Sequence, residues 1–278
     1  MTDRPVDHHR GIVQRTERLS PHMVRVVVGG DGLADFATSG LTDHYVKIVF
    51  PYEGVEYPRP FSVKACRETM PREVWPRLRT YTVRAWDPDA LELTLDFVVH
   101  GDEGLAGPWA ERAAPGDEVF LLGPGGGYAP SPEAGWHLMV GDESALPAIA
   151  ASLEALKDGT LAYVLIEVEG PQDELKLGTA AEAHITWLYR GDRPVGERLV
   201  TAVRELEFPD GDVHAFVHGE AGFVKELRRH LRVERGIPLE RLSISGYWRR
   251  GVDDEAWREV KRDWNRKVEA EEAAALAS

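Results

Sequence analysis

The segment from Arg79 to Arg84, R-T-Y-T-V-R, contains the residue types needed to bind a nucleotide cofactor with a flat ring system. If the segment is a strand, Arg79 and Tyr81 share one face and Thr82 points to the other. Arginine offers a forked donor for phosphate oxygens, tyrosine an aromatic plane, and threonine a hydroxyl that donates or accepts. The segment therefore fits a flavin nucleotide site. An ordinary half-exposed strand explains it equally well.

A run of small residues follows the predicted strand that ends at His100. Its sequence, G-D-E-G-L-A-G-P-W-A, covers Gly101–Ala110 and predicts a short helix over Asp102–Ala113. The free N–H groups and the positive dipole end at the start of a helix favour a pyrophosphate. A capped helix between two strands would look the same, but after R-x-Y-T the run is what an FAD-binding barrel requires.

A third segment, G-D-E-S-A-L-P-A over Gly141–Ala148, lies where a strand–turn–helix nucleotide site is expected. It lacks the G-x-G-x-x-G pattern, and its two acidic residues would repel a pyrophosphate. We take Asp142 and Ser144 as candidate contacts for NADPH or NADH. Arg190, at the end of a later predicted strand, is the candidate for a 2′-phosphate. A ferredoxin is the alternative electron donor.

The elements that must position these residues differ between the two halves of the chain. The first half contains short strand patterns with turn signals between them, and only Asp102–Ala113 is predicted to be helical there. The strands are expected over Met23–Val28, Tyr45–Phe50, Arg79–Arg84, Leu91–Val99 and Glu118–Leu122. Such a series predicts a closed antiparallel Greek-key barrel.

The second half alternates compact apolar runs with amphipathic helical patterns, which predicts a doubly wound parallel sheet. The runs are Trp136–Val140, Leu161–Val168, Ile185–Tyr189, Val213–Val217 and Leu242–Ser245. After Gly251 comes a last helix, whose apolar stripe consists of Trp257, Val260, Trp264 and Val268. We expect a cofactor-binding barrel over 1–130, a nucleotide-binding α/β domain over 131–250 and a helical extension over 251–278.

Composition narrows the possible partners. The 278 residues carry a formal net charge of −14, which argues against nucleic acid or an anionic membrane as the main partner. A single cysteine, Cys66, excludes an internal disulfide and a cysteine-held iron–sulfur cluster. No apolar run is long enough to span a bilayer, and the start MTDRPVDHHR has no apolar signal core. We expect a cytoplasmic monomer without membrane insertion or a bound metal.

Taken together, these motifs resemble the siderophore-interacting protein family, the FAD-dependent ferric-siderophore reductases. The resemblance runs from about Arg10 to the end. It rests on the three segments above and on D-F-V-V-H-G at Asp96–Gly101, H-G-E at His218–Glu220 and G-Y-W-R-R-G at Gly246–Gly251. It implies an FAD-holding barrel and the reduction of Fe(III) bound to a siderophore, with electrons from NADPH, NADH or a ferredoxin.

The resemblance also implies roles for single residues. It places Arg79 on the FAD phosphates, Tyr81 against the flavin ring and Thr82 near the flavin N5. The remaining implied cofactor-binding residues are Val83, His100, Gly104, Ala106 and Trp109. Lys47 matches a lysine that faces the siderophore pocket, and we take Arg249 and Arg250 as its basic companions.

Two departures from the family pattern concern the pyrophosphate site. Leu105 stands where a proline is usual, with Gly107–Pro108 in place of a polar pair, and Gly125 stands where we expect an arginine. Two other functions stay open. One is a general flavin reductase that passes electrons to a protein partner, and the other is a non-catalytic protein that binds a siderophore or a nucleotide.

Overall fold

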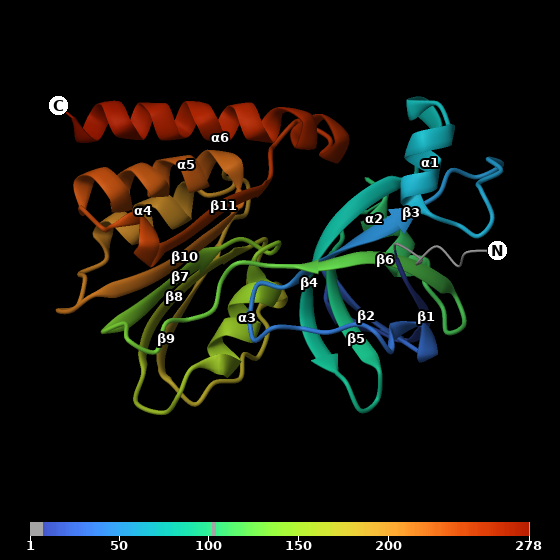
Figure 1. The fold of residues 1–278 in the computed structure, drawn as a ribbon. Helices are drawn as coiled ribbons and strands as arrows, with labels where there is room; N and C mark the ends of the chain where they lie inside the picture. The colour runs from blue at the N-terminus through green and yellow to red at the C-terminus, as the bar shows by residue number, and fades with distance from the viewer. Residues whose placement is uncertain (1–7, 102–103, 278) are drawn as a thin grey trace. The chain divides into compact units, whose positions relative to one another are not determined.

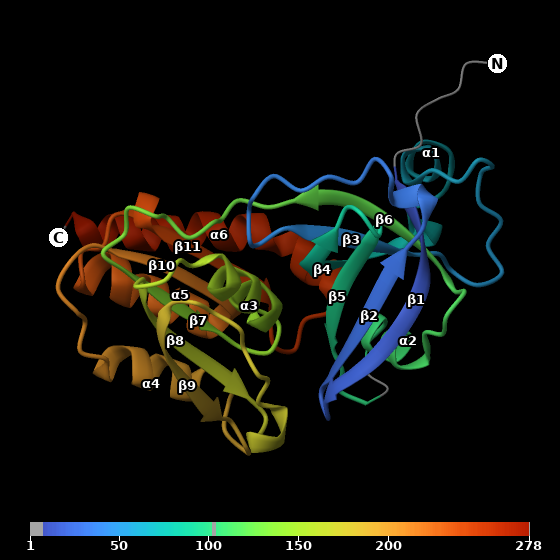
Figure 2. The same cartoon turned by 90° about the horizontal axis from the view of Figure 1, so that it is seen from below.

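The computed structural model describes residues 8–101 and 104–277, which form two compact units (Figures 1 and 2). The first unit extends to Gly126, and the second runs from Gly127 to the C-terminus. The turn Ser20–His22 belongs with the second unit. Its Ser20 Oγ and His22 Nδ1 each lie 2.9 Å from a carboxylate oxygen of Asp173, a residue that is 3% exposed.

The first unit is a closed antiparallel barrel, as predicted. It has six strands, of which the first, at the start of the described residues, was not predicted. Its strands follow the order β1-β2-β5-β4-β3-β6, and β6 pairs with β1 to close the barrel. The strands are β1 (His9–Ser20), β2 (Met23–Gly29), β3 (Tyr45–Phe50), β4 (Arg77–Asp87), β5 (Glu92–Val98) and β6 (Glu118–Gly125). The alternation in β5 has the expected effect, because Leu93, Leu95 and Phe97 are all fully buried in the barrel core.

Two α-helices accompany the barrel, which corrects the prediction of only one. Helix α2 spans Ala106–Arg112, shorter than expected; positions 102 and 103 of the predicted helix lie outside the described residues. Helix α1 spans Val63–Thr69 and was not predicted. The Ser62 hydroxyl caps α1 by accepting a hydrogen bond from the Ala65 N–H, and Cys66, within the helix, is fully buried.

The second unit is a five-stranded parallel sheet in the order β11-β10-β7-β8-β9, which confirms the predicted class. Its strands are β7 (Trp136–Gly141), β8 (Leu161–Val168), β9 (Glu182–Tyr189), β10 (Val213–Glu220) and β11 (Leu242–Trp248). Trp136, Leu138 and Val140 face one side of the sheet and form a core with α4 (Glu197–Glu205) and α5 (Ala221–Arg229). Helix α3 (Leu146–Ala155) follows β7 on the opposite side (Figure 1).

The remaining elements are short, apart from the last helix. A π-helical turn, His230–Glu234, continues α5, and 3₁₀ turns cover Asp31–Leu33, Arg72–Val74, Pro171–Asp173 and Leu239–Arg241. Helix α6 (Asp254–Leu276) has Trp257 and Val268 as its buried residues, while Val260, predicted on the same stripe, is 44% exposed. Among the described residues, no helix is both long and apolar enough to cross a membrane.

Candidate functional site

Strand β4 presents the R-x-Y-T segment with the predicted alternation. In the pairing with β3, Arg79 lies opposite Ile48 and Tyr81 opposite Val46. Both β3 residues belong to the barrel core, so Arg79 and Tyr81 share the core side of the strand pair. Both are half-buried, which leaves part of each side chain accessible to a ligand.

The Tyr81 ring is held by an aromatic cluster. Its centroid lies 4.2 Å from that of Phe97 on β5, and Phe97 lies 5.4 Å from Trp109 on α2. Phe50 contacts the same tryptophan at 5.8 Å. Trp109 and the buried Val83 therefore both have packing roles in the barrel core; their predicted cofactor contacts stay predictions.

Two glycines with positive φ, Gly101 and Gly104, stand between β5 and α2. Gly104 has a φ of +81°, which favours glycine, and His100 and Gly104 are both exposed. Ala106 and Gly107 are buried at the start of α2. A Cβ at Gly107 would come within 3.1 Å of the Val98 carbonyl oxygen, so glycine permits the close approach of α2 to β5.

These residues fit an FAD molecule by the chemistry of their groups. Arg79 is a partly accessible cation, Tyr81 supplies an aromatic plane supported from behind, and Thr82 supplies a hydroxyl on the other face of the strand. The first backbone N–H groups of α2 are donors for a phosphate. At Gly125, where an arginine was expected, a Cβ would lie 2.5 Å from the Tyr45 ring, so a larger residue there would require this exposed tyrosine to move.

Lys47 lies on β3, half-buried, directly opposite Thr80. Directly opposed residues of an antiparallel pair point to the same face, and Thr82 is two positions from Thr80. Lys47 and Thr82 therefore share the face of the β3–β4 pair opposite Arg79 and Tyr81, and Thr82 is buried there, at 7% exposed.

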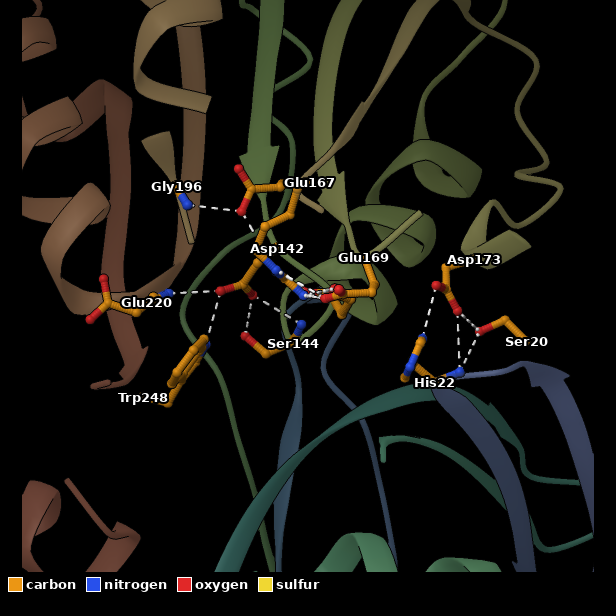
Figure 3. A network of polar contacts seen from close by, with 12 residues as sticks. Ser20, His22, Asp142, Ser144, Glu167, Glu169, Asp173, Gly196, Glu220 and Trp248 are labelled. Atoms are coloured by element: carbon orange, nitrogen blue, oxygen red, sulfur yellow. Dashed lines mark hydrogen bonds and ion pairs between the residues drawn. The ribbon is translucent and has the colours of Figure 1, made fainter. Parts of the chain in front are cut away.

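In the second unit, the turn after β7 is organised around a buried carboxylate (Figure 3). Asp142 is 0% exposed and accepts hydrogen bonds from the backbone N–H and hydroxyl of Ser144, at 3.0 and 2.5 Å. Its other oxygen accepts from the Glu220 N–H and the Trp248 indole N–H, both at 2.8 Å. Burial, and then the charge of Glu143, raise the pKa of Asp142 to about 6.

Arg190 lies in a cluster of carboxylates at the same end of the sheet. Its guanidinium bonds Glu143 through two nitrogens, at 2.7 and 3.2 Å, and Glu169 at 2.8 Å. Glu167 is 3.6 Å away and fully buried, and burial raises the pKa of its carboxyl group. Arg190 is itself only 8% exposed.

The candidate nicotinamide contacts are therefore turned toward protein partners. Asp142 and Arg190 are buried and hydrogen-bonded to protein groups, and the Ser144 hydroxyl donates a hydrogen bond to Asp142. Their contacts with a nicotinamide cofactor stay predictions.

The segment after β11 carries the candidate substrate-binding arginines. Arg249 and Arg250 are both exposed, and the Arg249 guanidinium lies 6.0 Å from the Trp257 ring centroid on α6. The prediction missed a further cation, Lys261 on α6. Its ammonium lies 3.2 Å from Ser245 Oγ, and burial lowers its pKa. Lys261 lies four positions after Trp257 and three before Trp264, so helical spacing places it on the apolar stripe, a signal that the prediction did not use.

Two family models match this chain, one for each unit. The model for the siderophore-interacting FAD-binding domain matches residues 12–128, and the model for the siderophore-interacting protein matches residues 134–251. The chain belongs to the siderophore-interacting protein family. The resemblance inferred from the motifs is thus confirmed, and the barrel is an FAD-binding domain of this family.

Several relatives share most of their length with the chain. An uncharacterised protein of Mycobacterium tuberculosis is 44% identical, over 95% of this chain and 97% of the relative. Ferric vibriobactin reductase ViuB of Vibrio cholerae is 33% identical, over 89% and 91%. An NADPH-dependent ferric-chelate reductase of Escherichia coli is 32% identical, over 85% and 91%.

Solved structures agree with this assignment. The siderophore-interacting protein SipS from Aeromonas hydrophila superposes with a TM-score of 0.80 at 29% identity, over 94% of this chain and 99% of that one. A ferredoxin–NADP⁺ reductase from Plasmodium falciparum gives 0.60 at 12% identity, over 86% and 96%. The second likeness shows the fold alone, which is ferredoxin-reductase-like.

Proposed function

We propose that this protein is an FAD-dependent reductase that transfers electrons from NADPH or NADH to Fe(III) in a siderophore and releases Fe(II) in the cytoplasm. The observation that carries the proposal is the half-buried Arg79–Tyr81 pair on β4, in a barrel of the siderophore-interacting FAD-binding type. The names of two relatives, a ferric vibriobactin reductase and a ferric-chelate reductase, support it.

The proposed FAD contacts are those of the barrel unit. Arg79 would bind the phosphates, Tyr81 the flavin ring, and Thr82 the ring edge near N5. His100, Gly104 and Ala106 would line the pyrophosphate and adenosine side, with Val83 and Trp109 completing the site. Bound FAD supplies redox chemistry that accepts a hydride and passes on single electrons.

The chain itself needs only to attract and orient the ferric complex. Siderophores hold Fe(III) through hard oxygen donors and bind the softer Fe(II) far less tightly, so one-electron reduction releases the metal. One reduced nicotinamide supplies two electrons and therefore reduces two ferric complexes. Within the described ranges, no group of three or more His, Cys, Asp or Glu side chains is placed to hold a metal ion.

Positive charge is the proposed means of substrate binding. Lys47 shares a strand face with Thr82, the proposed neighbour of the flavin N5, and is therefore our first candidate contact for an anionic ferric complex. Arg249 and Arg250 are exposed cations of the second unit, and we propose each as a candidate contact for an anionic ferric complex. On a chain with a net charge of −14, such local cations would attract an anion.

Two kinds of electron donor are candidates, because the turn after β7 is acidic. The name of the Escherichia coli relative supports NADPH. The buried Asp142 and Glu143 would repel a pyrophosphate at this turn, and this observation favours a ferredoxin as the second candidate donor.

The test is an anaerobic assay with purified, FAD-loaded protein and a colorimetric Fe(II) chelator. We expect NADPH or NADH, or a reduced ferredoxin, to support Fe(II) release from a ferric catecholate or hydroxamate. Protein that purifies without FAD and takes up none would overturn the proposal. Flavin reduction without Fe(II) release would favour the general flavin reductase.

A further inference from the structure

The Asp142 carboxylate has no capacity left for a ligand. A carboxylate offers about four acceptor positions, and Asp142 receives four hydrogen bonds, two on each oxygen. The donors come from Ser144, Glu220 and Trp248, so this one side chain joins the carboxyl ends of β7, β10 and β11 (Figure 3). Its side chain is also fully buried.

Glu220 extends this arrangement toward the arginines. Its backbone N–H donates to Asp142, and one side-chain oxygen caps α5 by accepting from the N–H groups of Gly222 and Phe223, at 2.6 and 3.3 Å. The other oxygen accepts from the backbone N–H of Arg250 at 3.2 Å. A Cβ at Gly219, where φ is +139°, would lie 2.7 Å from the Asp142 carboxyl carbon, so the close approach requires glycine.

The segment Trp248–Val252, which we name the basic turn, is consequently held at several points. The Trp248 indole is bound to Asp142, and the Arg250 backbone is bound to Glu220. The Val252 N–H donates to the Arg249 carbonyl at 3.1 Å, and the Arg249 guanidinium lies over the Trp257 ring. The two arginine side chains are exposed on a fixed backbone.

We propose that Asp142 and Glu220 are positioning residues, which fix the basic turn so that Arg249 and Arg250 meet an anionic ferric complex. In this role Asp142 has no contact with a nicotinamide cofactor. A cation held in its binding geometry before the substrate arrives loses less conformational entropy on binding. The proposal rests on the proposed function, because it deepens the role of the same substrate site.

Trp248→Phe tests the proposal with the smallest change. It removes the indole N–H that binds Asp142 and reduces the two fused rings to one aromatic ring. The probe is the Fe(III) complex of 2,3-dihydroxybenzoate, which is anionic, with neutral ferrichrome for comparison. We expect KM for the anionic complex to rise about three- to tenfold, the effect of one net hydrogen bond. Values of kcat, FAD content and KM for NADPH should stay unchanged, and the ferrichrome KM should change less.

A binding measurement separates positioning from turnover. The Ga(III) complex of 2,3-dihydroxybenzoate is not reduced, so its Kd, measured by calorimetry, should rise by the same factor in Trp248→Phe. Trp75→Phe is the matched control, because it also removes one indole hydrogen bond, to the Met70 carbonyl at 3.0 Å, but in the barrel unit. It should leave the Kd of the gallium complex unchanged.

Two conservative variants give the graded response that positioning predicts. Asp142→Asn keeps one acceptor oxygen and should weaken gallium-complex binding less than Asp142→Ala does. Circular dichroism checks that each variant is folded.

The outcomes distinguish this proposal from the proposed function. If the wild-type protein releases no Fe(II), the proposed function is wrong. If Trp248→Phe nevertheless binds the gallium complex more weakly than the wild type does, the positioning role still holds. An unchanged Kd and KM in a folded Trp248→Phe variant would overturn the positioning role. A rise in KM for NADPH alone in Trp248→Phe would also overturn the positioning role, since it would indicate that Asp142 acts at the nicotinamide site.

Discussion

Two segments of this chain, strand β4 in the barrel and the turn after β7 in the sheet unit, carry polar residues of the kinds that contact cofactors. On β4, Arg79 and Tyr81 are half-buried and keep part of their surface accessible. In the turn, Asp142 is fully buried and its carboxylate is saturated by protein donors. Arg190 at the same sheet end is likewise bound by carboxylates. Polar residues of the kinds that contact cofactors therefore indicate a binding site only where other groups of the protein do not already occupy their hydrogen-bonding positions.

Arg190→Ala should give the largest effect and tests the internal role directly. It leaves Glu143 and Glu167 buried without their counter-charge, which should lower the free energy of unfolding by about 3–5 kcal/mol. Urea unfolding measures this. Arg193→Ala, which removes an exposed pair with Glu197, is the control and should cost less than about 1 kcal/mol. Equal stability of the two variants, with a changed NADPH-to-NADH ratio of kcat/KM, would instead place Arg190 on a cofactor.

His137→Phe should change how the unfolding free energy depends on pH, because His137 is buried in the sheet unit. Burial, and then the nearby His214, lower the pKa of His137 from 6.5 to about 4. The unfolded chain therefore binds a proton that the folded protein excludes, and stability present above pH 6.5 is lost as the pH falls to 4. The loss for this residue is at most about 3 kcal/mol. Between pH 6.5 and pH 4, the unfolding free energy of His137→Phe should therefore fall less than that of the wild type. An equal fall in both proteins would contradict the lowered pKa of His137.

Arg79→Ala tests the proposed FAD contact on strand β4. Loss of a charge-assisted contact should weaken FAD binding by about 1.5–3 kcal/mol, while the unfolding free energy of the apoprotein changes little. Flavin absorbance of the purified protein and titration with FAD measure this. Arg15→Ala, which breaks an exposed barrel pair with Glu92, should keep full FAD content. Full occupancy in an Arg79→Ala, Tyr81→Ala double variant would remove the proposed site from β4.

Lys47→Ala should have the smallest effect. An exposed charge pair is worth about 1 kcal/mol in water, so KM for an anionic ferric complex should rise about fivefold. The salt dependence of KM should weaken as well, since the interaction is screened over about 8–10 Å. FAD content should stay intact. Lys64→Ala on α1 is the control, and a Lys47→Ala protein that matches it in KM and in salt dependence would exclude Lys47 from the substrate site.

The sequence predicted the elements whose signals are local. The period-two alternation of Leu93, Leu95 and Phe97 and the bounds of β3 and β8 followed from neighbouring residues alone. Helix α1 was missed because it spans only seven residues and its signal is a single capping hydroxyl, that of Ser62.

The arrangement of the polar groups was not predictable in the same way. Asp142 binds Glu220 and Trp248, which are 78 and 106 positions away. Arg228 and Arg232 stand among the apolar residues Phe223, Leu227 and Leu231, a pattern typical of a solvated helix face. Both nevertheless bind Glu272 on α6, with side chains about 15% exposed. No periodicity or spacing relates residues this far apart, so the motif around Asp142 identified the turn without revealing which groups it would hold.

The saturated carboxylate after β7 sets a condition for protein engineering. Replacing this turn with a glycine-rich phosphate-binding loop would remove Asp142, and with it the acceptor for the Glu220 N–H and the Trp248 indole. Three strand ends would lose their common attachment when the new loop was introduced. A redesign toward tighter dinucleotide binding therefore has to begin with β10 and β11, where each orphaned donor must first be given another acceptor.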